Sequence, residues 1–291
     1  MANKIAYIVS KKYNLHIFPI DEFAKFAESN GVDFVVERYS FDNLSKQTIT
    51  NLFACDAVVV GSFHEANAQL LDALGAELNL YAKCSFKPTD LGNLTTQNVI
   101  VVSNVAKHAE GEFATSKAFG REAVDTLKYS ELEIERTARI AYEFAEKRNH
   151  DLSLSDANTS KKSSVLWRKI VSDINEDYPS VRLDFESIQK TTHAFMDGTK
   201  SYDVILATDI YFDAMSGIVD LKNALGKGTS TLAYLGETAF GLYATECPDM
   251  FSPLFDYLAI DKMLACSFDM PKLLNAWRKK INSSYLQNKS I

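Results

Sequence analysis

The sequence is poor in glycine. Only 12 of its 291 residues are glycine, whereas an average composition of roughly 7% would give about 20. Nucleotide-binding proteins use glycines in the tight loops where the backbone approaches a phosphate group. The shortage therefore counts mildly against a chain built around such loops.

Cysteine and histidine are also few, and neither forms a metal-binding pattern. The four cysteines, Cys55, Cys84, Cys247 and Cys266, lie far apart and include no C-x-x-C pair. The five histidines form no H-x-H or H-x-x-x-H pair, so the sequence gives no support for a zinc site. Because unpaired, separated cysteines are typical of reducing compartments, we expect buried thiols and a cytoplasmic location.

Long apolar runs and an excess of positive charge are both missing. No apolar stretch approaches the roughly 18 residues of a membrane span, and residues 1–9 resemble a first strand rather than a signal peptide. The formal net charge is −7 and the isoelectric point about 5.3, which argues against binding to a phosphate backbone. We therefore expect neither a membrane nor nucleic acid as a partner.

Short apolar runs alternate with longer amphipathic stretches, in a chain long enough for one large domain or two closely packed ones. Strands are predicted at residues 4–9, 33–39, 57–61, 98–103, 181–185, 203–207 and 229–235. Helices are predicted at residues 19–30, 66–78, 130–148 and 165–174. This alternation predicts the α/β class with a substantial parallel sheet.

Two of the predicted helices carry clear end signals. Pro19 favours the first turn of the first helix, and Gly31 follows its end as a C-cap. Ser130 and Glu133 have the spacing of a capping box, in which each side chain bonds the other residue's backbone amide. We therefore expect a well-defined helix to begin directly after Ser130.

A series of motifs follows that helix start. Residues 129–148 read YSELEIERTARIAYEFAEKR, and residues 155–181 read SDANTSKKSSVLWRKIVSDINEDYPSV. The stretches at 202–216 (YDVILATDIYFDAMS), 110–113 (EGEF) and 80–82 (LYA) add to the pattern. In order and spacing these motifs resemble those of the isocitrate/isopropylmalate family of β-decarboxylating dehydrogenases.

The resemblance implies a fold, an activity and an assembly. The fold would be two interleaved α/β lobes around a central cleft, with residues 1–102 plus 223–291 in one lobe and 103–222 in the other. Family members oxidise a 2-hydroxy acid with NAD or NADP and decarboxylate it with Mg²⁺ or Mn²⁺. A homodimer is also implied, because the family's helix pair corresponding to residues 209–227 packs against its twin. That stretch keeps six apolar residues here: Ile210, Tyr211, Phe212, Met215, Ile218 and Val219.

The family's substrate-binding arginines have no counterpart in this chain. Arginine suits a carboxylate because its planar guanidinium offers two parallel hydrogen bonds. The resemblance places the three arginines near Gly75, Ser85 and Ser103, none of which is basic. Lys83 and Lys87 lie near the second position, but an ammonium does not directly replace the two-pronged contact.

The two groups that transfer protons in the family are also replaced. The lysine of its Lys-Ala-Asn motif corresponds to Asp156, followed by a matching Asn158. The tyrosine of its Glu-Gly-Glu-Tyr motif corresponds to Phe113, which keeps the ring and lacks the hydroxyl. General acid–base catalysis needs a group that can take and give a proton, so neither proton route of the family remains.

One of the three aspartates that hold the divalent metal in the family is kept. Asp213 matches the first of them, Gly217 replaces the last, and the remaining one falls at about Gln189. Asp209 stands where the family motif has asparagine and adds charge nearby. An alternative interpretation of Asp209 and Asp213 is helix N-capping, because both precede an apolar helical run.

The family's cofactor loops have largely changed. The glycine-rich first turn is replaced by SKKYNL at residues 10–15, and the adenosine loop reads ATECPDMFS at residues 244–252, where Asp249 survives. Three hypotheses follow. The protein is a non-catalytic relative that binds a small molecule or a partner, an enzyme with an altered substrate around Asp156, Asn158, Asp209 and Asp213, or a conventional dehydrogenase whose motifs are misaligned. The first is preferred, and no cofactor is expected to bind tightly.

Overall fold

The computed structural model describes most of the chain. The described residues are 3–9, 19–40, 44–63, 68–86, 99–105, 114–117, 122–125, 128–157, 161–221, 230–246 and 253–285. The strands are β1 (Asn3–Val9), β2 (Phe34–Ser40), β3 (Ala57–Phe63), β4 (Ala82–Phe86), β5 (Ile100–Asn104), β6 (Ala114–Lys117), β7 (Glu122–Asp125), β8 (Asp151–Asp156), β9 (Arg182–Ser187), β10 (Val204–Ala207), β11 (Ser230–Leu235) and β12 (Gly241–Glu246). The helices are α1 (Pro19–Ser29), α2 (Lys46–Leu52), α3 (Ala68–Glu77), α4 (Glu131–Glu146), α5 (Lys162–Asn175), α6 (Ile188–Asp197), α7 (Asp209–Leu221), α8 (Pro253–Cys266) and α9 (Pro271–Tyr285).

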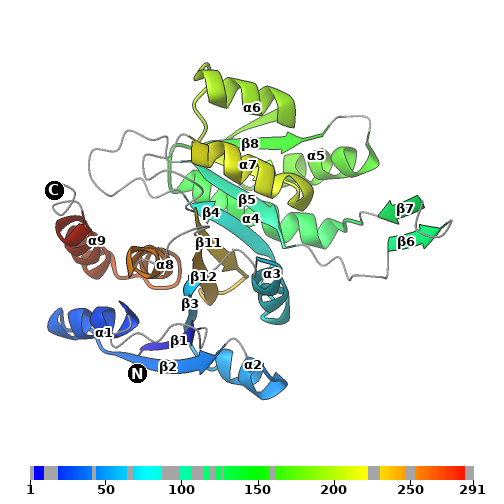
Figure 1. Ribbon diagram of the computed structural model, residues 1–291. Helices are drawn as coiled ribbons and strands as arrows, with labels where there is room; N and C mark the ends of the chain where they lie inside the picture. The colour runs from blue at the N-terminus through cyan, green and yellow to red at the C-terminus, as the bar shows by residue number, and fades with distance from the viewer. Residues whose placement is uncertain are drawn as a thin grey trace.

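One mixed sheet runs through the molecule (Figure 1). Its strand order is β2-β1-β3-β12-β11-β4-β5-β10-β8-β9, and β6 and β7 form a separate two-stranded antiparallel sheet. Strands β2, β1, β3 and β12 pair in parallel, as do β5, β10, β8 and β9. Between these groups, β11 and β4 pair antiparallel with their neighbours. The predicted α/β class with substantial parallel sheet is confirmed.

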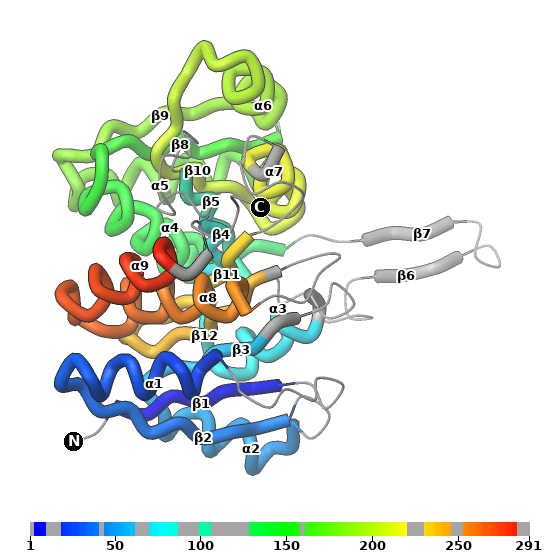
Figure 2. The backbone as a smooth tube through the Cα atoms, turned by 60° about the vertical axis from the view of Figure 1, so that its left-hand side comes forward, coloured from blue at the N-terminus to red at the C-terminus, as the bar shows by residue number. Residues whose placement is uncertain are grey.

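Helices cover both faces of this sheet, because its apolar side chains alternate between two sides. One buried cluster joins the sheet to α1, α4, α5, α8 and α9, and the other joins it to α2, α3, α6 and α7. Figure 2 shows the first group of helices following one side of the molecule. The result is three layers with the sheet in the middle, in which inner strands such as β4, β5 and β10 are buried along their whole length.

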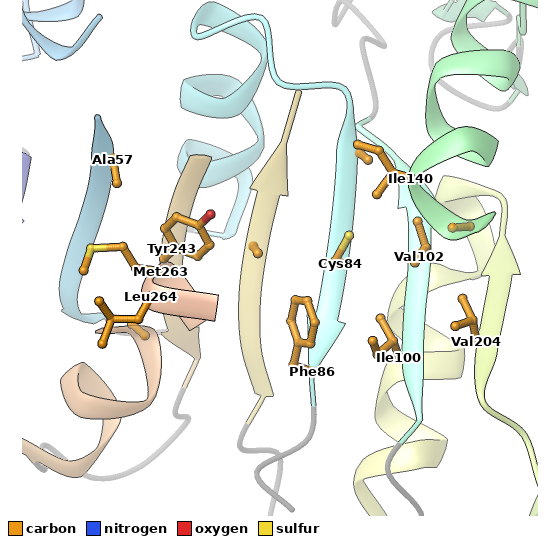
Figure 3. Packing of buried hydrophobic residues seen from close by; sticks show 14 of the residues in the cluster. Ala57, Cys84, Phe86, Ile100, Val102, Ile140, Val204, Tyr243, Met263 and Leu264 are labelled. Atoms are coloured by element: carbon orange, nitrogen blue, oxygen red, sulfur yellow. The ribbon is translucent and has the colours of Figure 1, made fainter. Parts of the chain in front are cut away.

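The centre of the first cluster lies under α8 and α4. Figure 3 shows Cys84 and Phe86 of β4, Ile100 of β5 and Tyr243 of β12 pointing to the same face of neighbouring strands. All four are less than one-tenth exposed. Burial of such side chains stabilises a fold by roughly 1.5–3 kcal/mol each. The middle of the sheet is therefore a rigid base for the residues at its strand ends.

The predicted helix ends are confirmed. Ser130 Oγ accepts a hydrogen bond from the Glu133 backbone amide, and the Glu133 carboxylate accepts one from the Ser130 amide, which completes the capping box. Gly31 follows α1 with a φ of 79°, a left-handed conformation that glycine adopts without strain. The seven predicted strands match β1, β2, β3, β5, β9, β10 and β11 within a few residues.

The strand order shows how the N-terminal and C-terminal parts of the chain share the sheet. Strands β11 and β12, from the C-terminal part of the chain, lie between β3 and β4 of the N-terminal part. Strands β10, β8 and β9 extend the sheet beyond β5. The division into lobes at residues 102 and 223 stays a prediction.

Candidate functional site

Several of the positions that the resemblance assigns to substrate and metal meet where β4, β5 and α7 adjoin. Ser85 Oγ on β4 lies 2.8 Å from Ser216 Oγ on α7. Ser103, near the end of β5, pairs in register with Lys83 of β4. The ammonium of Lys83 lies 3.8 Å from the carboxylate of Asp213. The third arginine position, Gly75, lies on α3, and a Cβ there would come within 2.8 Å of a ring atom of Tyr234.

Lys83 is the central charge of this region. Its side chain is only 10% exposed, and its ammonium nitrogen lies 3.1 Å from a carboxylate oxygen of Asp72 on α3. Tyr234, the register partner of Lys83 on β11, donates its hydroxyl to the same Asp72 oxygen, Oδ1, at 2.7 Å. The ammonium also lies 4.9 Å from the centre of the Phe212 ring, a cation–π contact. A buried cation needs such partners, because burial alone would strongly disfavour its charged form.

A small cavity opens next to this lysine, with a volume of about 150 Å³. We call it the Lys83 cavity. Its lining residues are Asp72, Lys83, Ser103, Asn104, Asp209, Ile210, Phe212 and Asp213. They include one lysine and three aspartates, so the formal charge of the lining is −2. Such a lining attracts cations and repels dianions.

The start of α7 is fixed by two side-chain contacts. The backbone amide of Asp209 donates to Oδ1 of Asn104 at 3.2 Å, which satisfies one N–H at the helix start. Tyr129 donates its hydroxyl to Oδ1 of Asp209 at 2.7 Å. Burial raises the pKa of Tyr129, and the hydrogen bond to Asp209 raises it further. This phenol is therefore a fixed donor at neutral pH.

The N-capping interpretation of the two aspartates is wrong for Asp213. The helix begins at Asp209, so Asp213 lies one turn inside it, with a side chain that is 90% exposed. Asp209 is the first helical residue, where a carboxylate interacts favourably with the helix dipole. The sequence suggested an N-cap at these positions because the apolar run that identified the helix begins after Asp209. Thr208, the residue directly before the helix, is a less preferred N-cap residue than aspartate.

Asp156 is buried at the end of β8 and faces a different partner. Its two carboxylate oxygens accept from Nε and Nη2 of Arg168 on α5, at 2.8 and 2.9 Å. Asp156 is 1% exposed, and Arg168 also lies over the Phe185 ring at 5.3 Å. The hydrogen bonds that Arg168 donates to Asp156 raise the pKa of this guanidinium. Neither residue lines the Lys83 cavity as the described residues form it.

Several predicted site residues fall outside the described residues. These are Phe113, Asn158, Lys87, Asp249 and the loop at 10–15. Their roles stay predictions.

The described residues do not fit a bound divalent metal. No group of three or more histidine, cysteine, aspartate or glutamate side chains among them is arranged to hold an ion. The ammonium of Lys83 lies beside Asp213 and Asp72, where it would compete with a metal for the same oxygens. At Gly217 a side chain would meet open space, and Gln189 lies on α6. The assignment of Asp213 as a kept metal ligand stays a prediction.

A larger hollow of about 560 Å³ lies on the opposite face of the sheet, along α4 and the β11–β12 turn. Its charged lining residues are balanced: Arg136, Arg139 and Lys147 against Glu135, Glu143 and Glu237. It contains none of the positions that the resemblance assigns to chemistry. The Lys83 cavity is therefore the better candidate for the functional site, despite its smaller volume.

Sequence reasoning missed three members of the site. Asp72 and Asn104 match no motif, and Tyr129 entered only as the first residue of the stretch at 129–148, with no role assigned to it. Only the fold brings α3, β5 and the start of α4 to one edge of β4. A charged residue inside the short run of β4 was an available signal, because a lysine in a strand covered on both faces needs a partner.

The protein is a mixed α/β protein built on one large sheet. Its candidate site lies at the ends of strands in the middle of that sheet. The family model for isocitrate/isopropylmalate dehydrogenase matches residues 79–243, more than half of the chain. The chain belongs to this family.

Curated relatives agree with this assignment. The 3-isopropylmalate dehydrogenase of Haemophilus influenzae strain 86-028NP is 34% identical over 178 residues, which cover 58% of this chain and 48% of that protein. That of Escherichia coli strain K12 is 33% identical over 184 residues, 60% of this chain and 49% of that protein. The chain spans about half the length of the curated relatives it matches.

Solved structures share the fold at lower identity. The isocitrate dehydrogenase from Methylococcus capsulatus superposes with a TM-score of 0.73 at 20% identity, covering 97% of this chain and 91% of that chain. A beta-decarboxylating dehydrogenase from Thermococcus kodakarensis superposes with a TM-score of 0.66 at 16% identity, covering 99% of both chains. The predicted family and fold are therefore confirmed. Among the described helices, none has the length and apolar character needed to cross a bilayer.

Proposed function

We propose that this protein is a divergent family member that lacks the standard NAD-dependent oxidative decarboxylation and acts by binding a small molecule or a partner. The observation that carries the proposal is the ion pair between Asp156 and Arg168. The resemblance assigns position 156 to a proton-transferring lysine. Here both oxygens of a buried carboxylate are engaged by one guanidinium, so the residue supplies neither the cation nor the proton of that lysine.

The charge of the Lys83 cavity supports the same proposal. The family's substrates carry at least two carboxylates, and its chemistry needs arginines to balance them. The lining of this cavity has a formal charge of −2, and Ser85 and Ser103 are buried serines at two of the arginine positions. A dianionic hydroxy acid would be repelled here, where the low local dielectric strengthens the repulsion.

The proposal includes weak cofactor binding. The stretch SKKYNL at residues 10–15 contains none of the glycines that a dinucleotide-binding turn uses for close backbone approach. We also propose a homodimer with a cytoplasmic location, in keeping with the apolar stretch on α7 and the separated thiols. Cys55 and Cys84 are buried and free, and Cys266 is partly buried and free.

The test is a turnover assay on the unmodified protein. The protein is incubated with NAD or NADP, with Mg²⁺ or Mn²⁺, and with isocitrate, 3-isopropylmalate, malate or tartrate, while reduced nicotinamide is followed by absorbance. We expect no turnover, and calorimetry should show no micromolar affinity for either nucleotide. Turnover of any of these acids by the unmodified protein would overturn the proposal.

A reversion variant identifies which losses matter. Asp156→Lys, Phe113→Tyr and Gly217→Asp together restore the two proton carriers and one metal ligand. We expect the triple variant to stay inactive, because the arginine positions and cofactor loops remain changed. Activity in the triple variant alone would show that these three positions are what silences the family reaction.

The second candidate function is an active oxidoreductase with an altered substrate. It is favoured by the fixed phenol of Tyr129 next to Asp209 and by Lys83 with its two carboxylate neighbours. A broader panel of hydroxy acids in the same assay separates the two functions, because only the enzyme would reduce a nicotinamide cofactor.

A further inference from the structure

A second cavity, the hollow of about 560 Å³ along α4 and the β11–β12 turn, lies across the sheet from the Lys83 cavity. We call it the α4 hollow. Its volume falls within the range of roughly 300–1,000 Å³ that is typical of small-molecule sites. Its walls combine apolar and charged side chains, which suits an organic ion with an apolar body. The charges of the walls therefore decide the class of ligand.

Two of the three cations in the α4 hollow are already engaged. The guanidinium of Arg139 donates from Nε and Nη2 to Glu135 at 3.1 and 3.0 Å, and from Nη1 to Asp177 at 3.0 Å. Lys147 lies 4.0 Å from Glu143 and is 74% exposed. Neither is a strong anchor for a ligand, because the first already has carboxylate partners and the second is largely hydrated.

Arg136 is the third cation, and it has no acidic partner among the described residues. It is a half-buried residue of α4, and its guanidinium carbon lies 5.5 Å from the centre of the Tyr81 ring. This cation–π contact offsets part of the cost of burying the charge. An oxyanion would accept from the N–H groups of the guanidinium, which are suited to a two-pronged contact with a carboxylate.

The hydroxyl of Tyr81 is a second donor in the same hollow. Tyr81 lines the hollow beside Arg136, and no described side chain accepts a hydrogen bond from its hydroxyl. Burial raises the pKa of Tyr81, and the charge of Glu237 adds to this effect. The phenol is therefore protonated at neutral pH and can donate. A guanidinium and a phenol on one wall match the two oxygens of a carboxylate.

The apolar part of the wall lies next to this pair of donors. Leu132 and Ile140 are one helical turn before and after Arg136 on α4, and both line the hollow together with Phe144 and Leu235. Leu132 is 53% exposed, so an apolar group in the hollow would remove part of its surface from water. A carboxylate held at Arg136 thus has apolar side chains beside it for the rest of the ligand.

The acidic residues limit the charge of that ligand. Glu135 and Glu143 lie beside cations of α4, whereas Glu237 is exposed on the β11–β12 turn with no described partner. Water screens the charge of Glu237, so it is a weaker anchor for a cation than Arg136 and its neighbouring phenol are for an anion. The three acidic and three basic side chains of the lining cancel formally. No excess positive charge is present to hold a dianion.

We propose that the α4 hollow binds an organic monocarboxylate with an aliphatic or aromatic body, with its carboxylate on Arg136 and Tyr81. The body lies against the apolar side chains of α4 and β11. This site goes beyond the proposed function, because it is a different cavity from the Lys83 cavity and is expected whether or not the family reaction is lost.

The first experiment compares probes that differ in one group. Calorimetry on the full chain uses 3-phenylpropanoate and 4-methylpentanoate as monocarboxylates and 3-phenylpropanamide as the neutral counterpart. The cation is 3-phenylpropylamine, the dianion is phenylsuccinate, and acetate is the carboxylate without a body. We expect at least one of the two monocarboxylates to bind about tenfold or more tightly than these four, since a charge-assisted contact is worth roughly that factor.

The second experiment assigns the cation. Arg136→Gln keeps a good helix former on α4 and should weaken the monocarboxylate about tenfold or more. Arg136→Lys keeps the charge without the planar fork and should weaken it less. Lys169→Gln is the matched control, because it removes a cation from an exposed position of α5 outside the hollow. It should change nothing, and urea midpoints check that each variant is folded.

The third experiment assigns the other two groups. Tyr81→Phe keeps the ring below Arg136 and removes the hydroxyl, and it should weaken the monocarboxylate about threefold or more. Glu237→Gln removes the opposing charge and should leave that affinity unchanged or higher, while it strengthens phenylsuccinate binding. Glu77→Gln is the control, because Glu77 is an exposed residue of α3 that does not line the hollow.

The outcomes separate this site from the proposed function. The proposal is overturned if no monocarboxylate binds, or if the amide or the amine binds as tightly as the acid. It is also overturned if Arg136→Gln and Lys169→Gln behave alike, or if Glu237→Gln weakens the monocarboxylate. None of these results changes the turnover assay with the family's acids, and turnover in that assay would leave the carboxylate site standing.

Discussion

Arg168 and Asp156 join helix α5 to the end of strand β8 through two parallel hydrogen bonds of 2.8 and 2.9 Å. The carboxylate is 1% exposed, whereas the arginine side chain keeps 24% of its surface. The carboxylate of Asp156 therefore lies in the interior, while the Arg168 side chain reaches towards solvent. Its geometry depends on the planar guanidinium, which an ammonium cannot reproduce.

Removal of Arg168 should be costly. Arg168→Met leaves a buried carboxylate without its counter-charge, and we expect the free energy of unfolding to fall by about 2–3 kcal/mol. Urea denaturation measures the change. The control is Arg182→Met, because Arg182 makes a similar two-pronged contact with Asp151 from a side chain that is 65% exposed. Its loss should be clearly smaller, and equal losses would show that burial does not set the strength of the pair.

Glu186 should make stability depend on acid pH. Burial alone would raise the pKa of this carboxyl, but hydrogen bonds from Tyr202 and Lys190 and the charge of Lys200 bring the net pKa below its ordinary value. A carboxyl with a lowered folded-state pKa contributes stability at neutral pH. That contribution is lost as the pH falls from roughly 4.3 through the lower folded value.

Glu186→Gln tests this sign. The variant should be less stable than the unmodified protein at pH 7, by about 1–2 kcal/mol, and the difference should shrink as the pH falls below about 4. Urea unfolding at several pH values gives both curves. Glu77→Gln removes an exposed carboxylate and should show no such convergence. A difference that stays constant with pH would mean that Glu186 acts through shape rather than charge.

Two glycines should respond to alanine in opposite directions. A Cβ on Gly61 of β3 would lie 2.1 Å from the hydroxyl oxygen of Tyr7. That hydroxyl is held by Asp256 at 2.6 Å. Gly61→Ala should therefore lower the free energy of unfolding by about 2–3 kcal/mol. Gly217 lies inside α7 with nothing within 4 Å of a Cβ, so Gly217→Ala should raise it by about 0.5–1 kcal/mol. Denaturation midpoints compare the two, and a stabilising Gly61→Ala would show that Tyr7 moves freely.

The assembly is expected to be a homodimer. On α7, Phe212, Met215 and Val219 already lie in the core of their own chain, but Ile210 remains 44% exposed. Light scattering at micromolar concentration should give twice the chain mass of 32.5 kDa. A monomer mass under these conditions would contradict the prediction.

Some strands could be predicted and others could not, for a physical reason. Strands such as β3 and β10 are continuous apolar runs, which is typical of parallel strands buried on both faces. β8 reads DLSLSD and β4 reads AKCSF, and both are nevertheless buried. Their polar side chains are satisfied by partners from elsewhere in the chain. Ser155 donates to Thr191 at 2.9 Å, and Lys83 pairs with Asp72. Helix α8 was missed because it is buried almost all round and lacks a polar stripe.

By itself the sequence determined the family, the α/β class and the capping box at Ser130, because each depends on motifs of residues close together in the chain. Only the tertiary structure decided which partners the residues of the candidate site have. The partner of Asp156 lies 12 residues away on another element, and Asp72 and Asn104 reach Lys83 from α3 and β5. A local pattern shows which side chains are present. Their partners depend on strand register and helix placement, which long-range packing of the sheet sets.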